Sequence, residues 1–211
     1  MEALNYTQSS TSQAGLSPAS AIQLLKEGNH RFMSTSPMER DFLGQVSLTS
    51  TGQYPFAAIV SCIDSRIPTE IVFDQGIGDI FNARVAGNFV NEDILGSLEF
   101  ACKLAGSKVI VIMGHTSCGA VKGACDNAQL GNLTAMLDKI MPAVNNVHTA
   151  EGEERNSSNL KFVNEVAVEN VKLTIQKLKK DSPVLNEMVM NGEIEVVGAM
   201  YDVKSGEVQF L

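Results

Sequence analysis

The sequence predicts an α/β fold with a mainly parallel sheet. Two runs dominated by apolar residues, 56–61 and 108–113, have the composition of strands that are buried on both faces, as in parallel sheets. A segment with helical spacing of its apolar residues, 91–106, lies between them. The order strand, helix, strand implies right-handed crossover connections. Near the C-terminus, two short segments flank VKSG at 203–206 and are typical of a hairpin.

The composition indicates one globular domain. Of the 211 residues, 44% are hydrophobic and 19% are charged, as in ordinary globular proteins. The formal net charge of -8 argues against nucleic acid as a partner, because phosphate binding needs clustered Lys and Arg. The start of the chain does not resemble an export signal, and no apolar run reaches the ~18 residues of a membrane span. We therefore expect a cytoplasmic protein without a membrane partner.

The N-terminal part is expected to contain an arm and one helix before the sheet begins. Residues 1–16 are rich in Ser, Thr and Gln and are predicted to form a mobile or loosely docked arm, followed by a single domain over 17–211. Ser17 and Pro18 suit the N-cap and the first position of a helix. Residues 34–54 lack periodicity and are expected to form a connecting loop.

The remainder of the chain alternates strands and helices. Pro68 favours a short helix after the first strand, and 79–84 is expected to be a second strand. The loop 148–159 is polar and expected to be exposed. The other helices are predicted at 91–106 with Asn91 as its cap, at 132–144, at 162–180, and from Pro183 to Gly192.

Three potential metal ligands follow the two apolar strands. Cys62 comes directly after the first strand, and His115 and Cys118 follow the second. In parallel sheets, sites gather at the carboxyl ends of the strands. Two thiolates and one imidazole suit zinc and leave a fourth position for water or substrate. Taken singly, each residue is also explained by structure alone, because cysteines are often buried as small hydrophobes and histidines often bond within turns.

Each of the remaining polar and thiol residues has more than one possible role. The four cysteines, which include Cys102 and Cys125, would allow two disulfides by count, but reduced thiols or metal ligands are favoured in a chain of this length without an export signal. Asp64 and Arg66 either provide a fixed hydrogen-bond acceptor beside a metal or form a simple ion pair that holds a turn. Two histidines, His30 and His148, are proton-shuttle candidates but are also typical of solvated surfaces.

The motifs resemble those of the β-class carbonic anhydrases. The similarity rests on CIDSR at 62–66 and HTSCG at 115–119, in that order. It covers roughly 53–125 and extends through three further stretches: ARVAGN at 83–88, GSLEFA at 96–101 and GAVKG at 119–123.

The resemblance implies a mixed sheet with a central parallel part flanked by helices, and a homodimer that in some members pairs into a tetramer. It implies zinc as the cofactor, one ion per chain, with Asp64 and Arg66 as the catalytic dyad. Phe100 replaces a tyrosine found in some members. By resemblance, the zinc ligands are Cys62, His115 and Cys118, and the substrate-binding residues are Gln53, Phe81, Phe100 and Gly119.

The implied reaction is the reversible hydration of carbon dioxide to bicarbonate and a proton. Zinc lowers the pKa of its bound water, and the zinc-bound hydroxide attacks carbon dioxide while Asp64 accepts its hydrogen bond. Some members have a closed resting site beside a tryptophan. Here Ile59 stands at that position and the chain has no Trp, which favours the open, plant-like subclass. The alternatives are action on another small electrophile such as carbon disulfide, or a non-catalytic zinc module.

Overall fold

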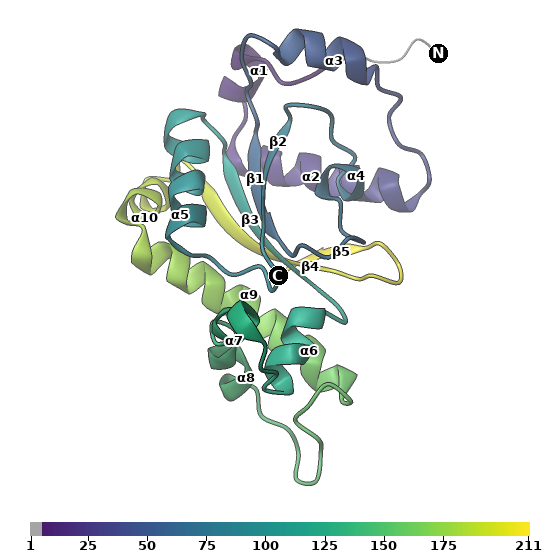
Figure 1. The fold of residues 1–211 in the computed structure, drawn as a ribbon. Coiled ribbons are helices and arrows are strands. Elements are labelled where there is room, and N and C mark those ends of the chain that lie inside the picture. Colours follow the sequence, from purple (N-terminus) through teal and green to yellow (C-terminus); the bar gives the residue numbers. More distant parts are fainter. Residues whose placement is uncertain (1–5) are drawn as a thin grey trace.

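The computed structural model describes residues 6–211, and these form one sheet with helices around it (Figure 1). The strands are β1 (Ala57–Ser61), β2 (Ile80–Arg84), β3 (Val109–His115), β4 (Glu195–Tyr201) and β5 (Val208–Phe210). They lie in the order β2-β1-β3-β4-β5, with parallel pairing from β2 through β4 and antiparallel pairing between β4 and β5. The predicted mixed sheet and C-terminal hairpin are thereby confirmed.

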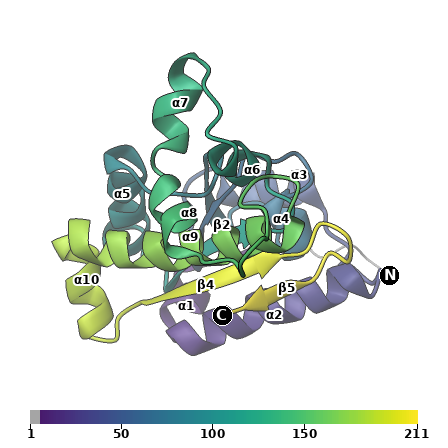
Figure 2. The same cartoon turned by 90° about the horizontal axis from the view of Figure 1, so that it is seen from below.

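Helices cover both faces of this sheet. They are α1 (Ser10–Ala14), α2 (Pro18–Met33), α3 (Phe42–Thr49), α4 (Thr69–Val72), α5 (Glu92–Glu99), the π-helix η1 (Phe100–Leu104), α6 (Gly119–Cys125), α7 (Gly131–Leu137), α8 (Met141–Asn146), α9 (Leu160–Asp181) and α10 (Pro183–Met190). Figure 2 shows strands β4 and β5 between α2 and α9. No helix in residues 6–211 is both long and apolar enough to cross a bilayer.

The core is built on β1 and β3, and α9 packs against β3 and β4. Every residue of β1 and β3 is buried, and each fully buried aliphatic side chain contributes about 1.5–3 kcal/mol. From α9, Phe162, Val166 and Val171 add their side chains to the same core. The two strands that precede the potential metal ligands are therefore held rigidly.

Part of the predicted loop at 34–54 is the helix α3. Asp41 caps it by accepting a hydrogen bond from the backbone N–H of Gly44 at 2.9 Å. Its buried residue is polar: Gln45 donates to the Tyr6 carbonyl and accepts from the Ile77 N–H. Its apolar residues point outward, with Leu43 82% exposed. This inverted pattern explains why hydrophobic periodicity did not indicate a helix.

Two other predicted helices are irregular. The segment predicted as a helix at 132–144 is divided into α7 and α8. Pro142 explains the break, because its ring lacks an N–H and clashes with the carbonyl of residue 138 in a continuous helix. The helix predicted at 91–106 begins at its Asn91 cap as expected, but its second half widens into η1.

The N-terminal segment is bonded to the domain. Residues 1–5 of the predicted arm lie outside the described residues. Farther along, the side-chain amide of Gln13 on α1 donates to the carbonyls of Pro55 and Ala105, both at 2.8 Å. The backbone N–H of Gln8 donates to the Asp79 carboxylate at 3.0 Å. These bonds connect the described part of the arm to the domain.

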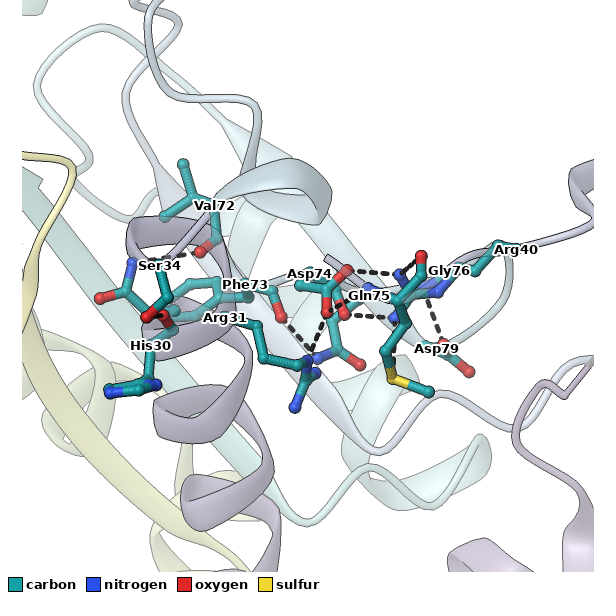
Figure 3. Close-up of polar contacts among 12 residues, drawn as sticks. His30, Arg31, Ser34, Arg40, Val72, Phe73, Asp74, Gln75, Gly76 and Asp79 are labelled. Carbon is teal, nitrogen blue, oxygen red and sulfur yellow. Dashed lines mark hydrogen bonds and ion pairs between the residues drawn. The ribbon is translucent and has the colours of Figure 1, made fainter. Parts of the chain in front are cut away.

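A second cluster of polar contacts holds the segment between α2 and α3. The carboxylate of Asp74 accepts hydrogen bonds from the guanidinium groups of Arg31 and Arg40 and from the backbone N–H of Met38 (Figure 3). Only 3% of the Asp74 side chain is exposed. Charges buried to this degree are retained only when paired and hydrogen-bonded, so Asp74 links three segments of the chain.

Candidate metal centre

Three side chains converge at the carboxyl edge of the sheet. Cys62 follows β1, His115 is the last residue of β3, and Cys118 is the N-cap of α6. All three are buried, and their ligand atoms lie within 4.8 Å of one another. The convergence predicted from the strand ends is thus present in the structure.

The imidazole of His115 leaves one nitrogen available. Its Nδ1 lies 3.0 Å from the carbonyl oxygen of Thr116, which can only accept, so Nδ1 carries the proton. The lone pair is therefore on Nε2, which is buried and has no hydrogen-bond partner among the described residues. An unpaired buried nitrogen costs about 1–3 kcal/mol. A metal ion at Nε2 would remove that cost.

The two cysteines have opposite acidities in the metal-free protein. The neighbouring Cys118 thiol acts as a hydrogen-bond donor towards the Cys62 sulfur, and this contact, aided by the backbone N–H groups of Gly87 and Asp64, lowers the pKa of Cys62 well below its usual range. The same contact and burial raise the pKa of Cys118 far above its usual range. A buried thiolate beside a thiol is half of a dithiolate ligand pair, and a divalent cation would displace the second proton.

This donor set fits zinc. Zinc prefers thiolate and imidazole ligands in tetrahedral sites, and three protein ligands leave one position open. Cys118 also lies at the start of α6, where the backbone N–H groups of Ala120 and Val121 favour its thiolate. The residues present therefore match a catalytic zinc site in both ligand type and number.

Asp64 lies beside the three potential ligands and is held by Arg66. The guanidinium group of Arg66 donates to both carboxylate oxygens, at 2.9 and 2.7 Å, and its backbone N–H donates to Oδ1 at 3.0 Å. These hydrogen bonds hold the pKa of Asp64 well below its usual range and raise that of Arg66. Oδ2 is 3.9 Å from Nε2 of His115. An ionised acceptor thus faces the potential metal position.

Arg84 shapes this turn, and its role is not apparent from the sequence. From the end of β2, its guanidinium group donates to the carbonyl of Cys62 at 2.9 Å and to that of Asp64 at 2.6 Å. In the sequence, Arg84 stands out only as part of ARVAGN. Its contacts join positions that are 20 and 22 residues apart, and local spacing does not encode them.

Comparison with known proteins agrees with this geometry. Residues 57–208, more than half of the chain, match the family profile described as carbonic anhydrase. The chain belongs to this family. It is 33% identical over 195 residues to carbonic anhydrase 2 of Mycobacterium tuberculosis, with 90% of each chain covered. It is 32% identical over 199 residues to the carbonic anhydrase of Mycolicibacterium smegmatis, with 91% and 92% covered.

The solved structures identify the class. The β-carbonic anhydrase CafA of Aspergillus fumigatus matches with a TM-score of 0.68 at 26% identity, over 92% of this chain and 89% of that one. The protein is therefore a β-carbonic anhydrase, a lyase that catalyses the reversible hydration of carbon dioxide. The alternatives of another small electrophile or a non-catalytic zinc module are not favoured.

In this β-carbonic anhydrase, the predicted substrate-binding residues are dispersed. Gly119 is exposed and directly follows Cys118, and a Cβ atom placed on it would meet no other atom within 4 Å. Phe81 and Phe100 form an edge-to-face pair with ring centroids 6.2 Å apart. They line a cavity of about 540 Å³ between β1, β2 and α5.

Gln53 does not approach the potential zinc ligands within the same chain. It is exposed and lies before the first residue of β1, whereas Cys62 lies after its last. Five steps along a strand span about 16 Å. His30 and His148 are both exposed, and neither they nor Cys102 and Cys125 belong to the cluster of potential metal ligands.

Proposed function

We propose that this carbonic anhydrase works with one zinc ion held by Cys62, His115 and Cys118. The observation that carries the proposal is the buried Nε2 of His115, which has no hydrogen-bond partner within residues 6–211 and belongs to a cluster with two cysteines whose ligand atoms lie within 4.8 Å of one another. Zinc would act there as a Lewis acid that makes water nucleophilic near neutral pH. The two thiolates donate more charge than two imidazoles would, so we expect half-maximal activity at a higher pH than in an all-histidine site.

Asp64 would orient the attacking water. Its carboxylate is ionised and adjacent to His115, so it accepts a hydrogen bond and directs a lone pair of the water oxygen towards carbon dioxide. Arg66 supports this role by donating to both carboxylate oxygens, which would keep Asp64 from binding the metal itself. This arrangement corresponds to an open resting site.

Substrate binding would be completed by a second copy of the chain. Gln53 is separated from Cys62 by the length of β1, and the ring of Phe100 is 50% exposed beside an apolar cavity. In a homodimer, these groups from one chain would close the cleft over the metal of the other. An amide donor can bind a substrate oxygen, and aromatic walls suit an apolar gas.

The proposal also includes the cellular compartment of the protein. We assign the protein to the cytoplasm because its cysteines are free thiols and two of them are arranged as metal ligands, which is typical of reducing compartments. Sedimentation would measure whether two of the proposed homodimers pair into a tetramer.

The proposal is tested by stopped-flow hydration of carbon dioxide with zinc-loaded protein. We expect about one zinc ion per chain, as a three-ligand site implies, and a rate well above that of buffer. Cys62→Ser should lose both zinc and activity. Zinc-loaded wild type that is no faster than buffer would overturn the proposal.

The role of Gln53 is tested by mixing two inactive variants, Gln53→Ala and Cys62→Ser, and refolding them together. If Gln53 acts across the dimer, a mixed dimer contains one complete site and activity returns. If Gln53 acts within its own chain, no mixture contains a complete site, and the mixture stays inactive.

A further inference from the structure

Helix α9 contacts the turn between His115 and Cys118 and also the loop after β2 that contains Gly87. It packs on β3, β4 and α6, and two of its side chains reach beyond the core. Asn164 and Asn170 are six positions apart, about 9 Å along a helix axis at 1.5 Å per residue. Each forms one hydrogen bond to the backbone of a different loop.

Asn164 holds the turn between His115 and Cys118. Its side-chain oxygen accepts a hydrogen bond from the backbone N–H of Ser117 at 2.9 Å. Ser117 has φ 55, the left-handed conformation that costs roughly 1–2 kcal/mol for a residue with a Cβ atom. A strained residue between two ligands keeps its conformation only where its surroundings hold it, and the Asn164 amide provides that restraint.

Asn170 holds the loop that faces the other cysteine. Its side chain is 3% exposed, and its Nδ2 donates to the carbonyl of Gly87 at 2.8 Å. Gly87 has φ 84, and a Cβ atom placed there would lie 2.5 Å from Cδ1 of Ile140. The backbone N–H of this same residue is one of the groups that lower the pKa of the Cys62 thiol, so Gly87 lies beside that sulfur. Asn170 therefore acts on Cys62 through one glycine.

We propose that Asn164 and Asn170 are positioning residues, and that α9 through them sets the separation of the two cysteine sulfurs at the metal centre. The inference rests on the zinc site of the proposed function. Each asparagine acts through its bond to the backbone of a loop. Partners of this kind typically change metal affinity 10- to 100-fold when they are removed.

The two hydrogen bonds have opposite polarity, which gives a matched test. Asn164 is an acceptor, so Asn164→Asp keeps its bond, whereas Asn164→Leu removes it. Asn170 is a donor to a carbonyl, so Asn170→Asp places an acceptor against an acceptor. Asn132→Asp, on the exposed first turn of α7, is the control for added charge.

The measurement is zinc retention by the full-length, zinc-loaded protein in competition with a chelator. We expect zinc binding 10- to 100-fold weaker for Asn170→Asp and Asn164→Leu, and within about twofold of wild type for Asn164→Asp and Asn132→Asp. With cobalt in place of zinc, the two weakened variants should also show a shifted thiolate-to-cobalt absorption band. The position of that band depends on ligand geometry, and a loss of general stability would not shift it.

The outcomes separate this inference from the proposed function. Wild-type zinc affinity in Asn170→Asp and Asn164→Leu overturns the inference while leaving the proposed function intact. Equal weakening in all four variants, Asn132→Asp included, also overturns it. A wild-type protein that binds no zinc overturns the proposed function itself. If Asn170→Asp does not fold, the two variants of the half-buried Asn164 still decide the question, because Asn164→Asp keeps the hydrogen bond and Asn164→Leu removes it.

Discussion

Arg66 binds Asp64 at two points, with Nε donating to one carboxylate oxygen at 2.9 Å and Nη2 to the other at 2.7 Å. The guanidinium side chain is 51% exposed, whereas the carboxylate is 15% exposed. An exposed ion pair contributes little to folding stability. The importance of this ion pair is geometric, because the planar guanidinium group fixes the plane of the carboxylate next to His115.

Arg66→Lys tests this geometric role. Lysine keeps the charge but makes only a single-point contact, so Asp64 can rotate. A lost charged hydrogen bond is worth about 1.5–3 kcal/mol, which corresponds to a roughly 10- to 100-fold lower kcat/KM at about 1.4 kcal/mol per tenfold. Stopped-flow kinetics at equal zinc content measures the effect. Glu165→Gln, which alters an exposed pair with Lys161, is the control, and an Arg66→Lys enzyme as active as this control would contradict the prediction.

Removal of the metal should reveal one acidic thiol. The neighbouring Cys118 thiol lowers the pKa of Cys62 well below its usual range, whereas burial raises that of Cys102 to about 12 and that of Cys125 to about 11. Titration of the chelator-treated protein, followed by thiolate absorbance, should therefore show one ionisation below pH 7 and the others above about pH 10. Cys62→Ser should abolish the acidic step. A single group of thiols titrating near pH 8.5 would show that the cysteine pair is not formed without metal.

The raised thiol pKa values also predict a loss of stability in alkali. In the unfolded chain, a thiol ionises near pH 8.5, whereas the folded Cys125 stays protonated until about pH 11. Between these values the folded state binds more protons, so the free energy of unfolding falls as pH rises. Urea unfolding of the metal-free protein at pH 8 and pH 10 should show this fall, and Cys125→Ser should reduce it. An unchanged slope in Cys125→Ser would assign the alkaline loss to other groups.

The parts of the fold that the sequence predicted are those with a local signal. The strands β1 and β3 are continuous apolar runs because both faces are covered, and the potential ligands follow them directly. Sheet geometry then brings Cys62 and His115 together, since parallel strands end at the same edge. Ser17 and Asn91 cap their helices as predicted, because capping depends on residues within one turn.

The parts that could not be predicted depend on contacts between distant positions. The bond from Asn170 to Gly87 spans 83 residues, and nothing near either residue indicates the other. α3 was missed because its buried side chain, Gln45, is polar and bonds to two separate segments. Gln53 is a different case, because a role in binding substrate would depend on a second chain.

The buried carboxylate of Asp74 should be important for stability. It joins Arg31 and Arg40, and the exposed fraction of its side chain is 3% and that of Arg40 is 9% (Figure 3). Asp74→Asn keeps the shape and tolerates the left-handed backbone at this position, but it leaves the guanidinium groups without a counter-ion. We expect the free energy of unfolding to fall by about 3 kcal/mol, measured by urea denaturation. Asp181→Asn, in an exposed pair with Lys177, should cost less than about 1 kcal/mol; equal losses in the two variants would contradict the prediction.

Gly87 should be the least replaceable glycine of the metal centre. Its φ of 84 is unfavourable for any residue with a Cβ atom, and Cδ1 of Ile140 occupies the space that such an atom would need, at 2.5 Å. Gly87→Ala should therefore lower the free energy of unfolding by at least about 2 kcal/mol, from overpacking and backbone strain. Because the backbone N–H of Gly87 lowers the pKa of the Cys62 thiol, the variant should also release zinc faster. Gly96→Ala is the matched control, since its Cβ atom would meet nothing within 4 Å and alanine favours a helix. A Gly87→Ala protein as stable and as zinc-retentive as Gly96→Ala would show that this loop adapts freely and does not hold Cys62.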